Sequence, residues 1–177
     1  MDEEELEAAA RGGRDSYEII VPVGDARIRL RGPKNPDETG ERISFWWSPT
    51  SSAIALAEHV MEMGLSAEMR VMELGCGLGL VGLSAGLCGA KTLLTDYVPE
   101  AVGFAAQNAG INQISGNVKC RVLDWENPGD LPTADLIVGS EIAYDYFFQG
   151  ALVELMDRTL ASTGKILLAD RKRLVVT

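Results

Sequence analysis

The sequence Arg70-Val-Met-Glu73-Leu-Gly75-Cys-Gly77-Leu-Gly79 decides the fold. Its apolar beginning predicts a buried β-strand, and the glycines that follow predict a tight turn, because glycine adopts backbone conformations that other residues resist. Residues 78–88 predict a helix directly after the turn. A strand, a glycine-rich turn and a helix in this order are typical of the first unit of an α/β fold with a ligand site at the turn.

The chain on either side of this unit continues the same pattern. Strands that alternate with helices predict an α/β, Rossmann-like, doubly wound and mostly parallel sheet, with strand order 3-2-1-4-5. Upstream, two extended runs around Gly24-Asp25 predict a β-hairpin, followed by a helix over residues 49–63 with Ser48 as its cap. The expected later strands are 91–96, 118–123, 134–139 and 165–169, and the expected helices are 99–112 and 147–160. The predicted organisation is an acidic flexible tail (1–16), a hairpin and loop (17–48) and a ligand-binding core (49–177).

Composition excludes several classes of protein. The net charge of −10 and pI of 4.6 argue against a nucleic-acid partner, which would call for a basic face. A small basic cluster at residues 171–173 is interpreted as a solvated helix start. No apolar run approaches the ~20 residues of a membrane span, and the N-terminus is acidic without an apolar signal segment, so a cytoplasmic protein with no membrane partner is expected. Three cysteines without paired spacing predict neither a disulfide framework nor a zinc site, and no metal is expected.

The glycine-rich turn departs from the dinucleotide-binding pattern. A GxGxxG motif would need glycine where the chain has Leu80, and the carboxylate of Glu73 before the glycines is poorly placed for a pyrophosphate. A carboxylate in that place suits a ligand with positive charge, and S-adenosylmethionine (SAM) carries an ammonium and a sulfonium. We therefore expect Glu73, Gly75, Gly77 and Gly79 to take part in SAM binding, against the alternative of a tight turn with no ligand.

Carboxylates end the next two predicted strands. Asp96 can accept hydrogen bonds from both ribose hydroxyls of a cofactor, and its neighbour Tyr97 is included as a candidate. Asp124 can accept from an adenine amine while Trp125 covers the ring. The alternative for Asp96 is a turn residue before Pro99. The alternative for Asp124 and Trp125 is a strand-ending turn with a core tryptophan.

The segment after the fourth strand, Ser140-Glu141-Ile-Ala-Tyr144, completes a resemblance. With Glu73-to-Gly79, Thr95-Asp96 and Leu123-Asp124-Trp125, it resembles the seven-β-strand SAM-dependent methyltransferases. More narrowly, it resembles the methyltransferase-like protein-lysine methyltransferases, the group that modifies electron-transfer flavoprotein β-subunit and valosin-containing protein. The resemblance implies catalytic roles for Glu141 and Tyr144 in an (Asp/Glu)-x-x-(Tyr/Phe) motif, Ser140 beside the cofactor, and a tryptophan enclosing it. Trp47 is the candidate for that tryptophan, with Trp46 as the alternative.

The resemblance implies N-methylation of lysine side chains in a protein substrate, with S-adenosylhomocysteine as the product. Glu141 has the alternative of a helix N-terminal acid. Tyr144, Tyr146 and Phe147 form either an aromatic channel for the lysine stem or core positions of the following helix. The resemblance also implies two further strands after the fifth, so the core is expected to be incomplete at its C-terminus, with an exposed edge strand.

Three other functions remain open from the sequence. A small-molecule methyltransferase on the same scaffold would have a closed pocket in place of an open groove. A non-catalytic module of this fold is disfavoured by the intact glycine turn and its carboxylates. A nicotinamide oxidoreductase conflicts with Leu80 and with the position of Glu73. The oligomeric state and the degree of methylation are not predicted.

Overall fold

The structure, a computed structural model, describes residues 15–34, 46–144 and 146–171. The predicted flexible tail lies almost entirely outside these residues, as do Lys172 and Arg173. The strands are β1 (Ser16–Val23), β2 (Ala26–Pro33), β3 (Arg70–Leu74), β4 (Lys91–Asp96), β5 (Val118–Val122), β6 (Ala134–Ser140) and β7 (Leu160–Ala169). The helices are α2 (Ser51–Glu62), α3 (Leu80–Leu87), α4 (Pro99–Ile111) and α5 (Gln149–Thr159).

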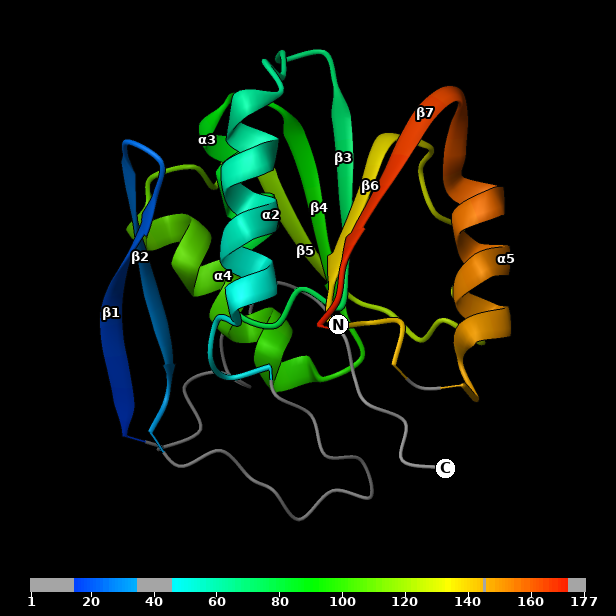
Figure 1. The fold of residues 1–177 in the computed structure, drawn as a ribbon. Helices are drawn as coiled ribbons and strands as arrows, with labels where there is room; N and C mark the ends of the chain where they lie inside the picture. Colours follow the sequence, from blue (N-terminus) through cyan, green and yellow to red (C-terminus); the bar gives the residue numbers. More distant parts are fainter. Residues whose placement is uncertain (1–14, 35–45, 145, 172–177) are drawn as a thin grey trace.

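The central sheet is parallel throughout its five strands. Its order is β5-β4-β3-β6-β7, which confirms the predicted 3-2-1-4-5 arrangement. The strands run from top to bottom in Figure 1, so their carboxyl ends gather at the bottom of the molecule. The antiparallel hairpin of β1 and β2 lies to one side as a separate two-stranded sheet, as predicted.

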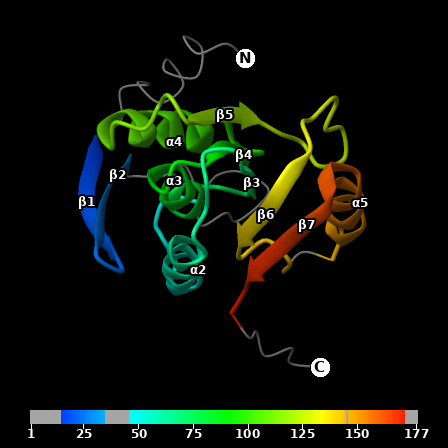
Figure 2. The ribbon, with the colours of Figure 1, turned by 90° about the horizontal axis from the view of Figure 1, so that it is seen from above.

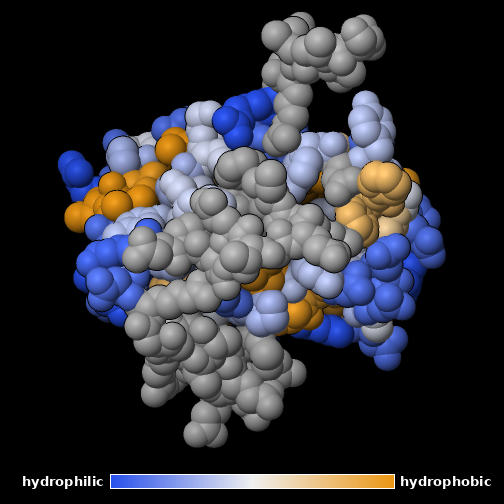
Figure 3. Space-filling model, turned by 90° about the horizontal axis from the view of Figure 1, so that it is seen from below, coloured by the Kyte–Doolittle hydropathy of each residue, from blue (hydrophilic) through white to orange (hydrophobic). Residues whose placement is uncertain are grey.

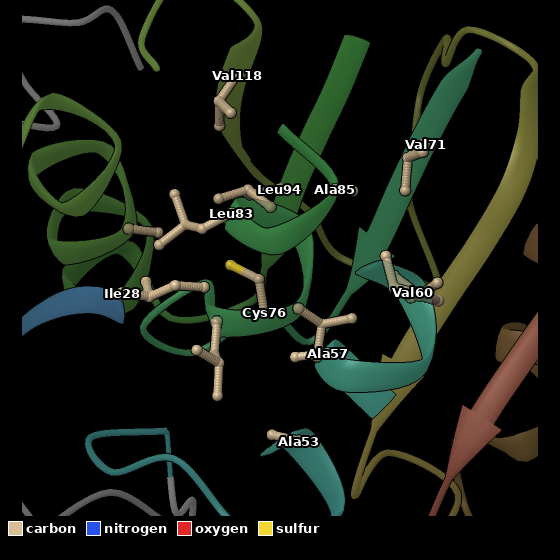
Figure 4. Packing of buried hydrophobic residues seen from close by; sticks show 14 of the residues in the cluster. Ile28, Ala53, Ala57, Val60, Val71, Cys76, Leu83, Ala85, Leu94 and Val118 are labelled. Atoms are coloured by element: carbon tan, nitrogen blue, oxygen red, sulfur yellow. The ribbon is translucent and has the colours of Figure 1, made fainter. Parts of the chain in front are cut away.

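The two faces of the sheet are covered by different helices. α2, α3 and α4 lie on one face and α5 on the other (Figure 2). Successive residues of a strand point to opposite faces, so Val71 packs with the first group of helices and Met72 with α5. The larger core cluster includes hairpin residues, and Ile28 of β2 and Leu83 of α3 point into it together (Figure 4). Hairpin and sheet therefore share one hydrophobic core.

Among the predicted boundaries that differ from the structure, two have an evident physical cause. α2 is capped by Thr50, whose side-chain oxygen accepts from the Ala53 N–H at 3.1 Å, and not by Ser48. β7 begins at Leu160, five residues before the predicted start, because Leu160 pairs with Ala134 before the register shifts. The turn-like composition Ala161-Ser-Thr-Gly164 predicted a loop, and the strand accommodates it as an irregularity next to the regular pairing of Lys165 with Leu136.

Asn108 of α4 and Asn112, the C-cap of that helix, fasten the hairpin to the rest of the molecule. Asn108 accepts from the Arg31 N–H at 2.7 Å and donates to the Arg31 carbonyl at 3.1 Å. Its amide also donates to the carbonyl of Leu78 in the glycine-rich turn at 3.1 Å. Asn112 makes the corresponding pair of bonds to the backbone of Arg29, at 3.0 and 2.7 Å. These side chains satisfy backbone groups of β2 as a neighbouring strand would.

We expect Asn108→Ala to destabilise the protein more than Asn112→Ala. Asn108 is completely buried, and its loss leaves the Arg31 and Leu78 backbone groups without partners, at a cost of about 2–4 kcal/mol. The bonds of Asn112 to Arg29 are exposed, so water replaces them and the cost falls below about 1 kcal/mol. Urea unfolding of both variants measures the difference, and equal losses would contradict the role of burial.

Candidate active site

The turn between β3 and α3 is built on three glycines with left-handed backbones. Gly75, Gly77 and Gly79 have φ angles of +64°, +52° and +88°, which other residues adopt only with strain. A Cβ at these positions would also lie 2.6, 2.8 and 2.9 Å from other protein atoms, namely Ile142 Cγ2, the Trp46 carbonyl oxygen and Leu94 Cδ1. The glycines are therefore required by the turn itself and by the protein atoms packed against it.

Asp96, at the end of β4, is hydrogen-bonded to this turn. One carboxylate oxygen accepts from the Gly77 N–H and the other from the Val98 N–H, each at 2.9 Å. The residue is 7% exposed, and burial raises the pKa of its carboxyl group. Each oxygen keeps a second lone pair, so the predicted bonds from ribose hydroxyls remain chemically open to it. Tyr97, the next residue, is 56% exposed at the same end of the sheet.

Glu73 occupies a different place from the one that its motif suggests. Its side chain is 1% exposed and its Oε2 accepts from the Gly82 N–H of α3 at 2.8 Å. Burial raises the pKa of this carboxyl group to about 8, so it is neutral at pH 7. Glu73 therefore supports α3 from beneath the turn, and its predicted contact with a positively charged ligand stays a prediction.

The residues after β5 lie next to the turn. The Cζ2 atom of Trp125 is 3.9 Å from the Cβ position of Gly75, and its Nε1 is buried with no hydrogen-bond partner. Asp124 closes a local turn by accepting from the Glu126 N–H at 3.0 Å and from the Asn127 side chain at 3.3 Å. Trp125 thus carries an unsatisfied donor, which costs free energy in a protein interior, while the adenine contact of Asp124 stays a prediction.

Glu141 directly follows Ser140, the last residue of β6. Its backbone is left-handed, with φ of +56°, and its side chain is 10% exposed. Oε1 accepts from the Ser52 hydroxyl at 2.5 Å and from the Arg171 Nε at 3.0 Å. The sequence analysis missed both partners, because Ser52 lies 89 residues away along the chain and carries no motif. Arg171, interpreted as part of a solvated helix start, instead pairs with Glu141.

The aromatic residues beyond Glu141 are exposed. Tyr144 is 42% exposed, and Tyr146 and Phe147 are 78% and 92% exposed. α5 begins only at Gln149, so Tyr146 and Phe147 are not core positions of that helix. The view from below, onto the carboxyl ends of the strands, shows hydrophobic patches between hydrophilic ones on this face (Figure 3).

The two tryptophans before α2 are positioned by the hairpin and by α4. The Tyr17 hydroxyl of β1 donates to the carbonyl of Trp47, and burial raises the pKa of Tyr17. The Trp46 ring lies 6.1 Å from that of Phe104 and meets Trp47 edge-on at 6.4 Å. Trp46 is thus tied to the core and its carbonyl lies against Gly77, while the predicted cofactor contact of Trp47 stays a prediction.

The described residues contain neither a candidate metal site nor a candidate membrane span. No cluster of three or more histidine, cysteine, aspartate or glutamate side chains there could hold a metal ion. Within the same residues, no helix has both the length and the apolar character needed to cross a membrane.

Several known proteins are similar to this chain. Residues 37–176 match a family model described as lysine methyltransferase. The chain is 32% identical over 117 residues to the protein-lysine N-methyltransferase rrg1 of Schizosaccharomyces pombe, covering 58% of this chain and 38% of that protein. It is 36% identical over 110 residues to the protein N-lysine methyltransferase METTL21A of Danio rerio, covering 59% of this chain and 50% of the relative. The chain thus spans half or less of the length of these relatives.

A solved structure supports the same fold. The ribosomal protein L11 methylase of Lactobacillus delbrueckii subsp. bulgaricus superposes with a TM-score of 0.55 and 25% identity, over 67% of this chain and 60% of that one. This superposition supports the α/β fold with its central parallel sheet.

We expect Glu73→Gln to remove part of the pH dependence of stability. The pKa of Glu73 is about 8 in the folded protein against a usual 4.5, so both states are protonated below pH 4.5. Between these values the unfolded chain ionises first, and the free energy of unfolding falls as pH rises, by about 5 kcal/mol in total. Urea unfolding of both proteins from pH 4.5 to 8.5 tests this; parallel curves would contradict it.

Proposed function

We propose a function from one premise: the chain belongs to the lysine methyltransferase family. On this premise it transfers a methyl group from SAM to the side-chain amine of a lysine in a protein substrate. The observation that carries the proposal is the family match over residues 37–176, on a sheet whose carboxyl ends gather Asp96, Asp124 and Glu141. The cytoplasmic location expected from the sequence belongs to the same proposal.

The polar groups around the glycine turn fit this cofactor. Trp125 offers a buried N–H that has no partner in the protein, next to the turn. Asp96 offers two acceptor oxygens beside the same turn, and hydroxyl groups are the donors that suit them. Acidic side chains at this edge also suit a ligand with two positive groups. The residues proposed to hold, enclose or support it are Trp47, Glu73, Gly75, Gly77, Gly79, Asp96, Tyr97, Asp124, Trp125 and Ser140.

The chain's own task is to position and prepare the amine. When bound, SAM supplies a methyl group on a positively charged sulfur, which leaves as a neutral thioether when an amine attacks. A lysine has a reference pKa of about 10.4, so it arrives protonated. Glu141 and the exposed Tyr144 hold the ammonium in place, and its proton passes to water before the nitrogen lone pair can react.

The experiment for this proposal is a transfer assay with Asp96→Asn as the test variant. The chain is incubated with methyl-labelled SAM and a cell lysate, which is then separated into proteins, nucleic acids and small molecules. We expect label in proteins with the unchanged chain and at least a tenfold loss with Asp96→Asn, since an amide replaces one of two acceptor oxygens with a donor. Asp157→Asn, an exposed position on α5, is the matched control and labels normally.

Other outcomes redirect or remove the proposal. Label only among small molecules would favour the small-molecule methyltransferase that the sequence analysis left open. No label in any fraction, with S-adenosylhomocysteine still bound in calorimetry, would favour a non-catalytic module. Unchanged affinity for S-adenosylhomocysteine in Asp96→Asn would remove the ribose role of Asp96.

Glu141→Gln separates binding from turnover. The amide keeps the size of the side chain and loses its charge, so we expect affinity for S-adenosylhomocysteine to stay within about twofold while the labelling rate falls about 100-fold. Calorimetry and the labelling time course measure the two effects. A variant that labels as fast as the unchanged chain would show that Glu141 does not hold the ammonium.

A further inference from the structure

The carboxylate of Glu141 is held from outside its own segment. Its left-handed backbone costs about 1–3 kcal/mol, and such strain persists only where the surroundings fix it. The Glu141 N–H donates to the Ala169 carbonyl at 2.9 Å, which ties the strained residue to the end of β7. The strain therefore serves to direct one side chain, which lies 10% exposed at the end of β6.

Three donors converge on a single oxygen of that side chain. Oε1 accepts from the Ser52 hydroxyl at 2.5 Å, from the Arg171 Nε at 3.0 Å and from the Arg171 backbone N–H at 3.2 Å. A bond of 2.5 Å between a hydroxyl and a carboxylate is in the range of strong, charge-assisted hydrogen bonds. With one oxygen fixed in this way, rotation of the carboxylate is restricted.

Ser52 is the better-placed of the two side chains to fix the carboxylate. The side chain of Arg171 is 56% exposed, so water competes for its contact, and its ion pair contributes little. Ser52 is half-buried in the first turn of α2, which contains no acidic residue of its own. The partial positive charge at the start of this helix attracts a negatively charged carboxylate beside it.

We propose that Ser52 is a positioning residue for methyl transfer: its hydroxyl fixes the Glu141 carboxylate in the orientation that receives the substrate's ammonium. This inference rests on the proposed function. Without the hydroxyl, the carboxylate still attracts the ammonium but samples other orientations, so the amine is aligned less often. The expected result is a lower kcat with little change in KM.

The test is a double-mutant cycle on Ser52→Ala and Glu141→Gln. The four proteins are compared in the lysate assay with labelled SAM, at several lysate concentrations, which gives an apparent kcat and KM for protein labelling. Ser52→Thr, which keeps a hydroxyl, is the rescue variant. Ser51→Ala, one residue away on the same helix and exposed, is the matched control. Calorimetry with S-adenosylhomocysteine confirms that each variant is folded and binds.

Ser52→Ala is expected to lower kcat about tenfold, as the loss of a hydrogen bond to a charged group does. The same change in the Glu141→Gln background should cost less than about twofold, because the two residues act as one unit. Ser52→Thr should recover most of the rate and Ser51→Ala should lose none.

Three results would overturn the inference. The first is an equal loss from Ser52→Ala in both backgrounds, the second is normal labelling by Ser52→Ala, and the third is a raised KM with unchanged kcat. If the unchanged chain labels no protein, the proposed function itself fails and the inference falls with it. The unchanged chain by itself reveals that outcome, before any variant is compared with it.

Discussion

The left-handed turn between β3 and α3 is the constraint on which the rest of the structure depends. Three residues with positive φ bring the chain from the centre of the sheet into a helix within five residues of the strand's end. The turn packs so tightly that Ile142, Trp46 and Leu94 fill the space where side chains would stand. The turn thus sets the direction in which α3 leaves the sheet, and Asp96 and Trp125 lie beside the same stretch of backbone.

The two carboxylates next to the turn accept hydrogen bonds from different parts of the chain. Glu73 accepts a hydrogen bond from the Gly82 N–H of α3, and burial raises the pKa of its carboxyl group to about 8. Asp96 accepts a hydrogen bond from the Gly77 N–H, at the edge of the sheet where the strands end. A carboxylate therefore has a structural role near the end of β3 and a candidate binding role at the end of the neighbouring strand β4, where Glu73 pairs with Leu94, two residues before Asp96. Burial alone, 1% against 7% exposed, is too similar to separate them, and their bonding partners do so.

The sequence predicted the fold well because its signals are local. The alternating glycines specify a turn, the apolar runs specify strands, and Gly24-Asp25 between two extended runs specifies a hairpin. The strand order follows from general rules of chain connection. The sequence could not reveal Ser52 beside Glu141, or Asn108 against Arg31, since these contacts join positions 89 and 77 residues apart. The burial of Glu73 was missed although its partner Gly82 is only nine residues away, because the motif specifies a position in the chain and not the helix packed against it.

The hairpin and the glycine turn are joined by two routes that do not pass through the sheet. Tyr17 holds the backbone of Trp47, next to the Trp46 carbonyl against Gly77, and Asn108 bridges Arg31 to Leu78. Thermodynamic linkage makes such a connection reciprocal. If a ligand that orders the turn tightens the docking of the hairpin, a partner that binds the hairpin changes the affinity of the turn for that ligand by the same free energy. The hairpin is in that case a distant surface through which ligand binding at the turn is controlled.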